Sequence, residues 1–295
     1  MSTADVSMNV VAPRRTVAQS ITGIWRYREL LVNLVRKELK VRYKNSSLGF
    51  LWSMLNPLMY LVVFYVVFQL VLKAGIPYFP VFLLSGLLAW NLFSSSLAGA
   101  TGSITGNASL VNKVWFPREI LPLAAIGANF VHFLLQGMVL VIALVVFRFD
   151  VDWGYAWLVV PALLALLVLT AALAIFLAAA NVYARDTQHL LELALLAWIW
   201  MTPIIYQWDL QARVLADNGR SPMLTLLNPM TSITLAFQRA LYGITTGSDG
   251  GRLLPLESSL WYGRNLLIVG LASSVLLVLA LRTFARAEGS FSEEL

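Results

Sequence analysis

The sequence predicts an all-α, polytopic membrane protein with six transmembrane helices, an N-terminal amphipathic interface helix and an extracytoplasmic re-entrant helical hairpin between helices 5 and 6. Of its 295 residues, 59% are hydrophobic and only 12% are charged, and the mean hydropathy is +0.75. Soluble domains carry about 25% charged residues. In addition, uncharged apolar stretches of about 20 residues, the length of a helix that crosses a bilayer, recur along the chain.

The basic residues are concentrated near the N-terminus. The net charge is +6, and nine of the 21 Lys and Arg residues precede Ser46. Such clustering favours anionic lipid headgroups or an acidic protein surface as partners, and we expect no nucleic acid. The chain has no Cys, which excludes disulfides, thiolate metal sites and Cys nucleophiles together.

Residues 1–22 are polar and lack the apolar core of a secretory signal, so we expect a flexible cytoplasmic tail. Residues 23–48 form the predicted interface helix, with apolar side chains on one face and basic ones, Arg36 and Lys40 among them, on the other. Two interpretations remain open: an anchor on the membrane surface, or a protein-docking or gating element. Gly49 then permits a tight bend into the first span and is a candidate hinge.

Six apolar stretches have the length of a transmembrane helix, and together they make residues 49–285 one transmembrane domain. The predicted spans are about 52–72, 79–100, 120–147, 157–182, 189–206 and 260–284.

A seventh apolar stretch, residues 221–243, contains Pro229 and Arg239. An Arg at the bilayer centre costs about 2.5 to 3.5 kcal/mol, so we assign this stretch to a re-entrant gate hairpin. A simple surface re-entrant remains the alternative. Residues 286–295 are a predicted cytoplasmic tail.

The distribution of Lys and Arg orients the spans. The N-terminal segment is strongly basic, and Lys113, Arg118 and Arg185 lie in loops that an even number of spans places on the same side. The opposite short loops have only Lys73 and Arg148. The positive-inside rule therefore predicts that both termini are cytoplasmic.

Two of these loops and several residues of the predicted spans are candidate functional sites. The loop "NASLVNKVWFPRE" places Trp115 and Phe116 among charges, typical of an interface anchor or of an aromatic belt. Tyr60, Phe64 and Phe68 form one stripe on the first span, which suits sugar rings or simple packing. Polar side chains form a stripe on the third span, most simply for hydrogen bonds between helices: Asn129, His132 and Gln136.

Five long blocks resemble the ABC-2 type permeases that export lipid-linked polysaccharides, the Wzm-like and teichoic-acid exporter group. They are "LVRKELKVRYKNSSLGFLWSMLNPL", "FLLSGLLAWNLFSSSL", "NKVWFPREILPL", "YARDTQHLLELALLAWIWMTPIIY" and "LLNPMTSITLAFQRALYG". The resemblance covers nearly the whole chain in order. It also suggests the actinobacterial galactan exporters, while O-antigen and teichoic-acid cargoes remain open.

The resemblance implies roles for individual residues. An ATPase-docking set would comprise Asn112, Lys113, Val114, Trp115, Phe116, Arg185, Asp186, Arg36 and Lys40. A sugar channel would be lined by Tyr60, Phe64, Trp198 and Tyr206, and Gly49, Pro229 and Arg239 would serve the gate and hinge. We expect neither catalytic nor metal-binding residues.

The source of energy for transport distinguishes the possible functions of the chain. No G-x-x-x-x-G-K-[ST] phosphate loop occurs, so we expect no cofactor in this chain and assign ATP and Mg²⁺ to a partner ATPase. The expected assembly is two copies of this chain with two ATPase subunits, a lipid-linked polysaccharide and membrane lipids, in the bacterial inner membrane. An ion-coupled secondary carrier and a membrane glycosyl- or phosphotransferase are the alternatives, although both need convergent ionisable groups.

Overall fold

The computed structural model describes residues 17–44, 51–248 and 250–295, in which the chain is helical apart from its connections and one isolated β-bridge between Thr246 and Arg252. The predicted hinge at Gly49 lies outside these residues. The elements, in chain order, are α1 (Val17–Arg26), α2 (Arg28–Tyr43), α3 (Leu51–Phe64), η1 (Tyr65–Val71), α4 (Phe79–Thr101), η2 (Thr105–Asn107), α5 (Ala108–Lys113), α6 (Ile120–Val146), α7 (Trp153–Ala156), α8 (Val159–Tyr183), α9 (Thr187–Trp200), α10 (Trp208–Asp217), η3 (Pro222–Leu227), α11 (Pro229–Leu241), α12 (Ser259–Ala287), η4 (Glu288–Ser290) and α13 (Phe291–Glu294).

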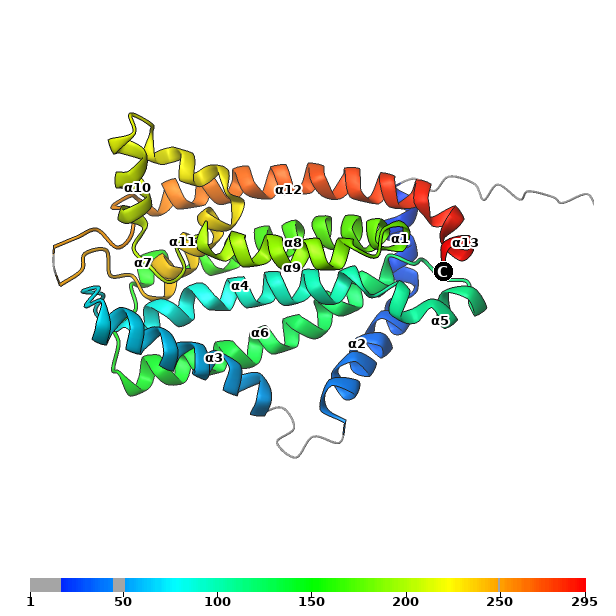
Figure 1. Ribbon diagram of the computed structural model, residues 1–295, viewed down its shortest axis with the longest axis horizontal. Coiled ribbons are helices and arrows are strands. Elements are labelled where there is room, and N and C mark those ends of the chain that lie inside the picture. The colour runs from blue at the N-terminus through cyan, green and yellow to red at the C-terminus, as the bar shows by residue number, and fades with distance from the viewer. Residues whose placement is uncertain (1–16, 45–50, 249) are drawn as a thin grey trace, which may run out of the picture.

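Four long helices, α4, α6, α8 and α12, run side by side along the longest axis of the molecule (Figure 1). Each lies in a stretch that is long and apolar enough to cross a membrane: Phe79–Thr101, Ile120–Val146, Trp153–Tyr183 and Ser259–Ser290. They confirm four of the predicted spans as apolar helices of crossing length.

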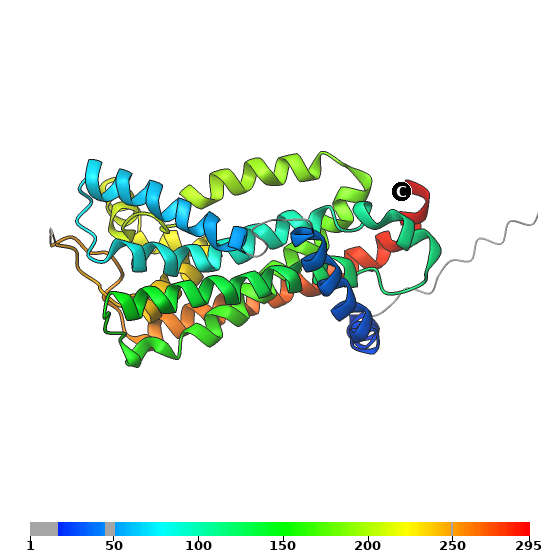
Figure 2. The same cartoon turned by 90° about the horizontal axis from the view of Figure 1, so that it is seen from below.

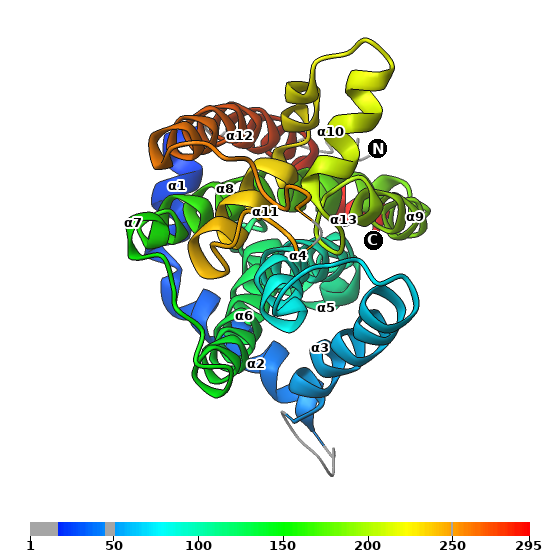
Figure 3. The ribbon, with the colours of Figure 1, turned by 90° about the vertical axis from the view of Figure 1, so that its left-hand side faces the viewer.

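The other two predicted spans are built differently. At 52–72, α3 continues directly into the π-helix η1, and at 189–206, α9 ends at Trp200 and is followed by turns. Both lie on the same side of α4 (Figures 2 and 3). In the described part of the chain, helix length alone therefore establishes four crossings and not six.

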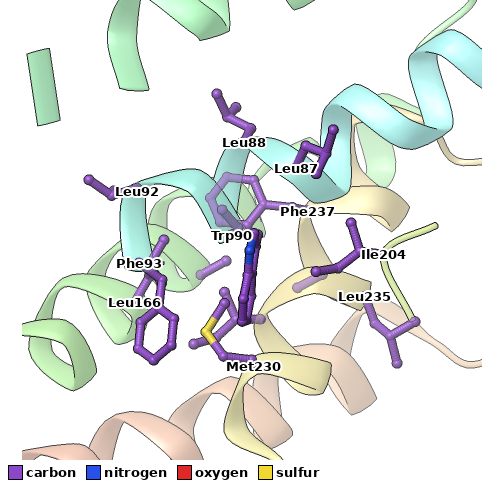
Figure 4. Packing of buried hydrophobic residues seen from close by; sticks show 14 of the residues in the cluster. Leu87, Leu88, Trp90, Leu92, Phe93, Leu166, Ile204, Met230, Leu235 and Phe237 are labelled. Carbon is purple, nitrogen blue, oxygen red and sulfur yellow. The ribbon is translucent and has the colours of Figure 1, made fainter. Parts of the chain in front are cut away.

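Helix α4 is the centre of the bundle, with α6, α8, α9 and α11 packed around it (Figure 3). In its most apolar window 78% of the residues are buried, compared with 22% in α6. Figure 4 shows how Trp90 and Phe93 of α4 meet Leu166 of α8 and Met230 and Phe237 of α11. The main apolar core therefore surrounds α4, while much of α6 faces outward.

Two hydrogen bonds connect α4 and α6 across this packing. Asn129 Nδ2 donates to the Ser95 carbonyl at 3.1 Å, and Asn91 Nδ2 donates to Gln136 Oε1 at 3.1 Å. These bonds satisfy polar groups that would otherwise be stranded among apolar side chains. They confirm, for Asn129 and Gln136, the expectation that the polar stripe on the third span joins helices.

The predicted interface helix is two helices rather than one. The chain breaks at Tyr27, whose φ of −97° and ψ of 23° are not helical, and α2 then runs obliquely against α6 (Figure 1). Its apolar face contacts protein: Leu34 is buried, and Val35 lies against Gly127 of α6. The prediction of a flexible tail up to residue 22 is wrong for residues 17–22, because they belong to α1 and Ser20 is buried.

Both described chain ends lie at the same end of the bundle, which we call the α5 end (Figure 1). Residues 286–295 are not a free tail there, because Phe291 is fully buried in a second apolar cluster with Phe116 and Phe284. The opposite end, the α10 end, holds α7, α10 and α11.

The predicted gate stretch does break at Pro229, where Asn228 caps α11. However, α11 is not a surface helix, because its residues from Met230 to Ala240 are all buried. The surface alternative for this stretch is therefore wrong for α11. Helix α10, in the preceding connection, had no counterpart in the prediction.

Candidate functional site

The loop between α4 and α6 presents a compact surface at the α5 end. Asn112, Lys113, Val114 and Trp115 are exposed, and the Trp115 side chain is 72% exposed. Phe116 is only 2% exposed, so it holds the loop in the second apolar cluster and does not offer a contact. The structure therefore places four of the five predicted docking residues of this loop at the surface and buries the fifth, Phe116.

This loop also contacts the N-terminal helices. The rings of Trp115 and Tyr27 meet edge to face with centroids 6.4 Å apart, and Lys37 Nζ donates to Asn107 Oδ1 at 2.7 Å. Beneath the loop, Ser20 Oγ donates to Oε1 of Glu119 at 3.0 Å, and both residues are buried. Helices α1 and α2 are thus fixed to the loop by three separate side-chain contacts.

The second predicted loop, between α8 and α9, lies beside the C-terminal segment. Arg185 and Asp186 are exposed. Tyr183, just before them, hydrogen-bonds through its hydroxyl to the Ala287 carbonyl at 2.9 Å and to Ser290 Oγ. The sequence did not single out Tyr183, because its partners are about a hundred residues away.

The C-terminal segment joins the first loop as well. Arg118 Nη1 donates to the Glu288 carbonyl at 2.6 Å, and its guanidinium lies 5.7 Å from the centroid of the Phe291 ring. The predicted α2 residues Arg36 and Lys40 are exposed. The α5 end therefore presents two exposed loops held by one C-terminal segment.

The predicted sugar-channel aromatics do not form one group. Tyr60 and Phe64 stack on each other, with centroids 5.9 Å apart, and Tyr60 is exposed. Trp198 is partly buried against Phe93, at 5.1 Å between centroids, and its Nε1 donates to Asn228 Oδ1 at 2.8 Å. Trp198 therefore uses its one hydrogen-bond donor for a contact inside the protein.

Tyr206 is also committed within the fold. Its hydroxyl donates to the Trp200 carbonyl at 2.7 Å and accepts from Gln211 Nε2. This side chain thus fixes the turn after α9 to α10.

At the α10 end, the Asn228 side chain makes hydrogen bonds to several segments, and the sequence did not reveal this role. Its Oδ1 accepts from Met230 N at 3.1 Å, which caps α11, as well as from Trp198. Its Nδ2 donates to Thr202 Oγ1 at 3.0 Å. One amide therefore connects the start of α11 to the end of α9.

Arg239 is a buried cation at the other end of α11. It is 9% exposed, pairs with Asp152 at 3.2 Å and lies 3.6 Å from the centroid of the Tyr155 ring. It also donates to the Gly243 carbonyl. Asp152 is thus the ionic partner of the candidate gate residue.

Known proteins resemble this chain over most of its length. The model of the ABC-2 type transporter family matches residues 29–242. The chain is 34% identical over 222 residues to the O-antigen export system permease protein RfbA of Myxococcus xanthus, which covers 75% of this chain and 84% of that protein. A Klebsiella pneumoniae protein of the same name is 31% identical over 210 residues, covering 71% and 79%. The polysialic acid transport protein KpsM of Escherichia coli is 33% identical over 98 residues, 32% of this chain and 36% of its own.

Proposed function

The chain belongs to the ABC-2 type transporter family, and on that premise we propose that it is the permease subunit of an ATP-driven polysaccharide exporter. The observation that carries this function is the alignment of about three quarters of the chain with O-antigen export permeases. The matched region includes the exposed loops of the α5 end and all of α11.

We further propose six crossings, with both termini in the cytoplasm of a bacterium and the protein in its inner membrane. Helices α3 and η1 are continuous from Leu51 to Val71, on the order of 30 Å of helix, which is enough for one crossing. Helix α9 with the turns that follow it supplies another. The position of α1 and α13 at one end supports an even number.

A second copy of the chain fits the exposed side formed by α3 and α9. On α9, side chains spaced three and four residues apart are exposed and apolar: Leu190, Leu193, Leu196 and Trp200. Two such faces would enclose a path between the copies, with Tyr60 and Phe64 as the accessible aromatics. The cargo proposed for this path is a lipid-linked polysaccharide of O-antigen, galactan or teichoic-acid type.

In an assembly of two chains, the α5 ends are the proposed docking surface for two ATPase subunits, which would hold ATP and Mg²⁺. Trp115 supports this assignment, because exposed aromatic residues are the commonest anchors of protein interfaces. Arg36, Lys40, Arg185 and Asp186 would form the charged rim. Pro229 and Arg239 would position the gate helix α11 at the α10 end.

The test is export in cells that make the chain together with its ATPase. Depleting the chain should leave completed lipid-linked polysaccharide at the cytoplasmic face, and an ATPase variant unable to hydrolyse ATP should do the same. Export that stops with a proton uncoupler while ATP is present would instead identify an ion-coupled carrier. Glycan elongation by the purified chain alone would identify a transferase.

A further inference from the structure

A polar cavity lies between α2, the end of α4 and the first half of α6. Its volume is about 330 Å³, within the range of roughly 300 to 1,000 Å³ typical of ligand sites. The charged lining residues are Lys37, Glu38 and Arg42 of α2, and Asn129 and His132 of α6 contribute polar side chains. None of the functional assignments above uses this cavity.

Arg42 is exposed on α2, but its guanidinium contacts a buried residue of α6. Its Nη1 donates to Asn129 Oδ1 at 3.2 Å. Asn129 lies nine residues beyond Ile120, about 14 Å along α6 from the α5 end of that helix. The Asn129 amide is held in place because its Nδ2 donates to the Ser95 and Ala125 carbonyls. Arg42 therefore combines a fixed acceptor in the bundle with an exposed side that a lipid headgroup can reach.

The cavity lining carries more positive than negative charge. Among the described lining residues, Lys37 and Arg42 oppose one carboxylate, Glu38, which gives a formal charge of +1 before His132 is counted. Glu38 and Arg42 are four residues apart, a spacing that allows an ion pair. In the described contacts, however, Arg42 donates to Asn129 and not to Glu38.

Both cations keep donors for a further acceptor. Lys37 Nζ donates to Asn107 Oδ1 at 2.7 Å, and Asn107 Nδ2 donates to the Ser103 carbonyl, which fixes the acceptor. An ammonium has three donors and a guanidinium five, so each Asn occupies only one. Phosphate oxygens, like carboxylates, form strong charge-assisted hydrogen bonds with Arg and Lys.

We propose that this cavity binds the phosphate group of an anionic membrane lipid, with Lys37 and Arg42 as the binding residues. The apolar part of the lining, which includes Val41, Leu121 and Ala125, favours a lipid over a free anion. Headgroup phosphates lie at the border of the hydrocarbon region, where the exposed side chains of Lys37 and Arg42 on α2 can meet them. The site does not depend on the identity of the exported cargo.

The experiment is native mass spectrometry of the full chain released from lipid nanodiscs, with bound lipid counted per chain. With phosphatidylglycerol, the double variant K37Q/R42Q should retain about tenfold less lipid than the unchanged chain, because two charge-assisted contacts are lost. The matched control is Arg36→Gln, which removes a charge from the same helix outside the cavity and should retain lipid normally. Equal retention by the double variant and the unchanged chain would overturn the proposal.

A second variant separates the cavity from general charge effects. Ala128→Leu keeps every charge but fills space in the lining, and it should also lower retention if it unfolds at the same temperature as the unchanged chain. Full retention by Ala128→Leu would count against the cavity as the binding place.

The same experiment with other lipids and with inorganic phosphate identifies which kind of molecule supplies the bound phosphate group. Phosphatidylcholine should be retained poorly, and a long-chain polyprenyl diphosphate should be retained at least as well as phosphatidylglycerol. Inorganic phosphate at millimolar concentration should not displace the lipid, and displacement would show a site for free anions instead. Because no ATPase or glycan is present, these results are independent of whether the chain exports polysaccharide.

Discussion

Arg118 donates a 2.6 Å hydrogen bond to the backbone carbonyl of Glu288, a residue 170 positions further along the chain. The guanidinium also lies 4.0 Å from the Glu288 carboxylate. Because Tyr183 binds the Ala287 carbonyl and Ser290, one short C-terminal segment connects both loops of the α5 end. The two loops should therefore respond to a docked partner as one unit.

Replacing Arg118 should test this connection. Arg118→Ala is expected to destabilise the chain by about 1 to 2 kcal/mol, since it removes a charge-assisted hydrogen bond that is only partly shielded from solvent. It should also reduce export more than the stability loss explains. Thermal unfolding and export assays measure the two effects, with exposed Arg185→Ala as the stability control. Full export by a chain that lacks the Arg118 side chain would show that the loops act separately.

Trp115 should matter more for partner binding than for folding. Its indole is largely exposed and the substitution loses the ring contact with Tyr27, so Trp115→Ala should lower the free energy of unfolding by no more than about 0.5 to 1.5 kcal/mol. Loss of a buried interface anchor costs about 2 kcal/mol or more, so affinity for the ATPase should fall at least roughly 30-fold. The matched control is Trp153→Ala at the α10 end, where Trp153 is 82% exposed. Equal binding by both variants would remove Trp115 from the interface.

The contact between α2 and α6 can be tested with two glycines of one helix. A Cβ at Gly127 would lie 2.7 Å from Val35 Cγ2, whereas a Cβ at Gly137 would meet nothing within 4 Å. Gly127→Ala should lower the melting temperature and expose α2 to protease. Gly137→Ala should be neutral or stabilising by up to about 1 kcal/mol, because Ala favours helix. The interpretation of α2 as a packed helix requires that Gly127→Ala destabilises the chain and that Gly137→Ala does not.

Arg239 should be much more sensitive than its partner Asp152. Arg239→Ala removes an ion pair, a contact with the Tyr155 ring and a hydrogen bond to Gly243, and we expect a loss of about 2 to 4 kcal/mol. Asp152 is substantially exposed, so Asp152→Asn should cost about 1 kcal/mol or less. Thermal unfolding of both variants checks this order. If Asp152→Asn costs as much as Arg239→Ala, the ion pair dominates instead of the burial of Arg239.

Asn228 offers a test of the connection between α9 and α11. Asn228→Ala removes a helix cap and leaves the Trp198 indole N–H without its acceptor, which together should cost about 2 to 4 kcal/mol. Asn228→Asp keeps both acceptor contacts and loses the donor to Thr202, so its cost should be smaller. Exposed Asn218→Ala serves as the control in thermal unfolding. A cost below about 0.5 kcal/mol for Asn228→Ala would show that this side chain does not connect α9 to α11.

The sequence predicted the long helices well because length and apolar composition suffice to define them. The predicted span 79–100 is α4 at Phe79–Thr101, and 120–147 is α6 at Ile120–Val146. Shorter elements were not predictable in this way. The π-helix η1 has the same composition as the helix it continues, and the break at Tyr27 interrupts a pattern that reads as one amphipathic helix.

The candidate sites were predictable as segments but not as sets of contacts. The first loop was located correctly, yet only packing shows that Trp115 points outward and Phe116 inward. The ionic partner of Arg239 lies 87 residues away in the chain, and the partners of Tyr183 lie about a hundred residues away. A periodic pattern in a local stretch of sequence therefore cannot reveal them. Pairing between distant residues depends on the folded arrangement of the helices.

The long helix that is most buried within the protein, α4, is not the most hydrophobic one. It is the least apolar of the four long helices, with a window hydropathy of 1.6 compared with 2.2 in α6, because protein and not lipid surrounds it. In a saturation mutagenesis experiment, outward positions of α6 should therefore tolerate changes of volume and reject charge. Positions of α4 should accept small hydroxyl-bearing residues and reject bulk.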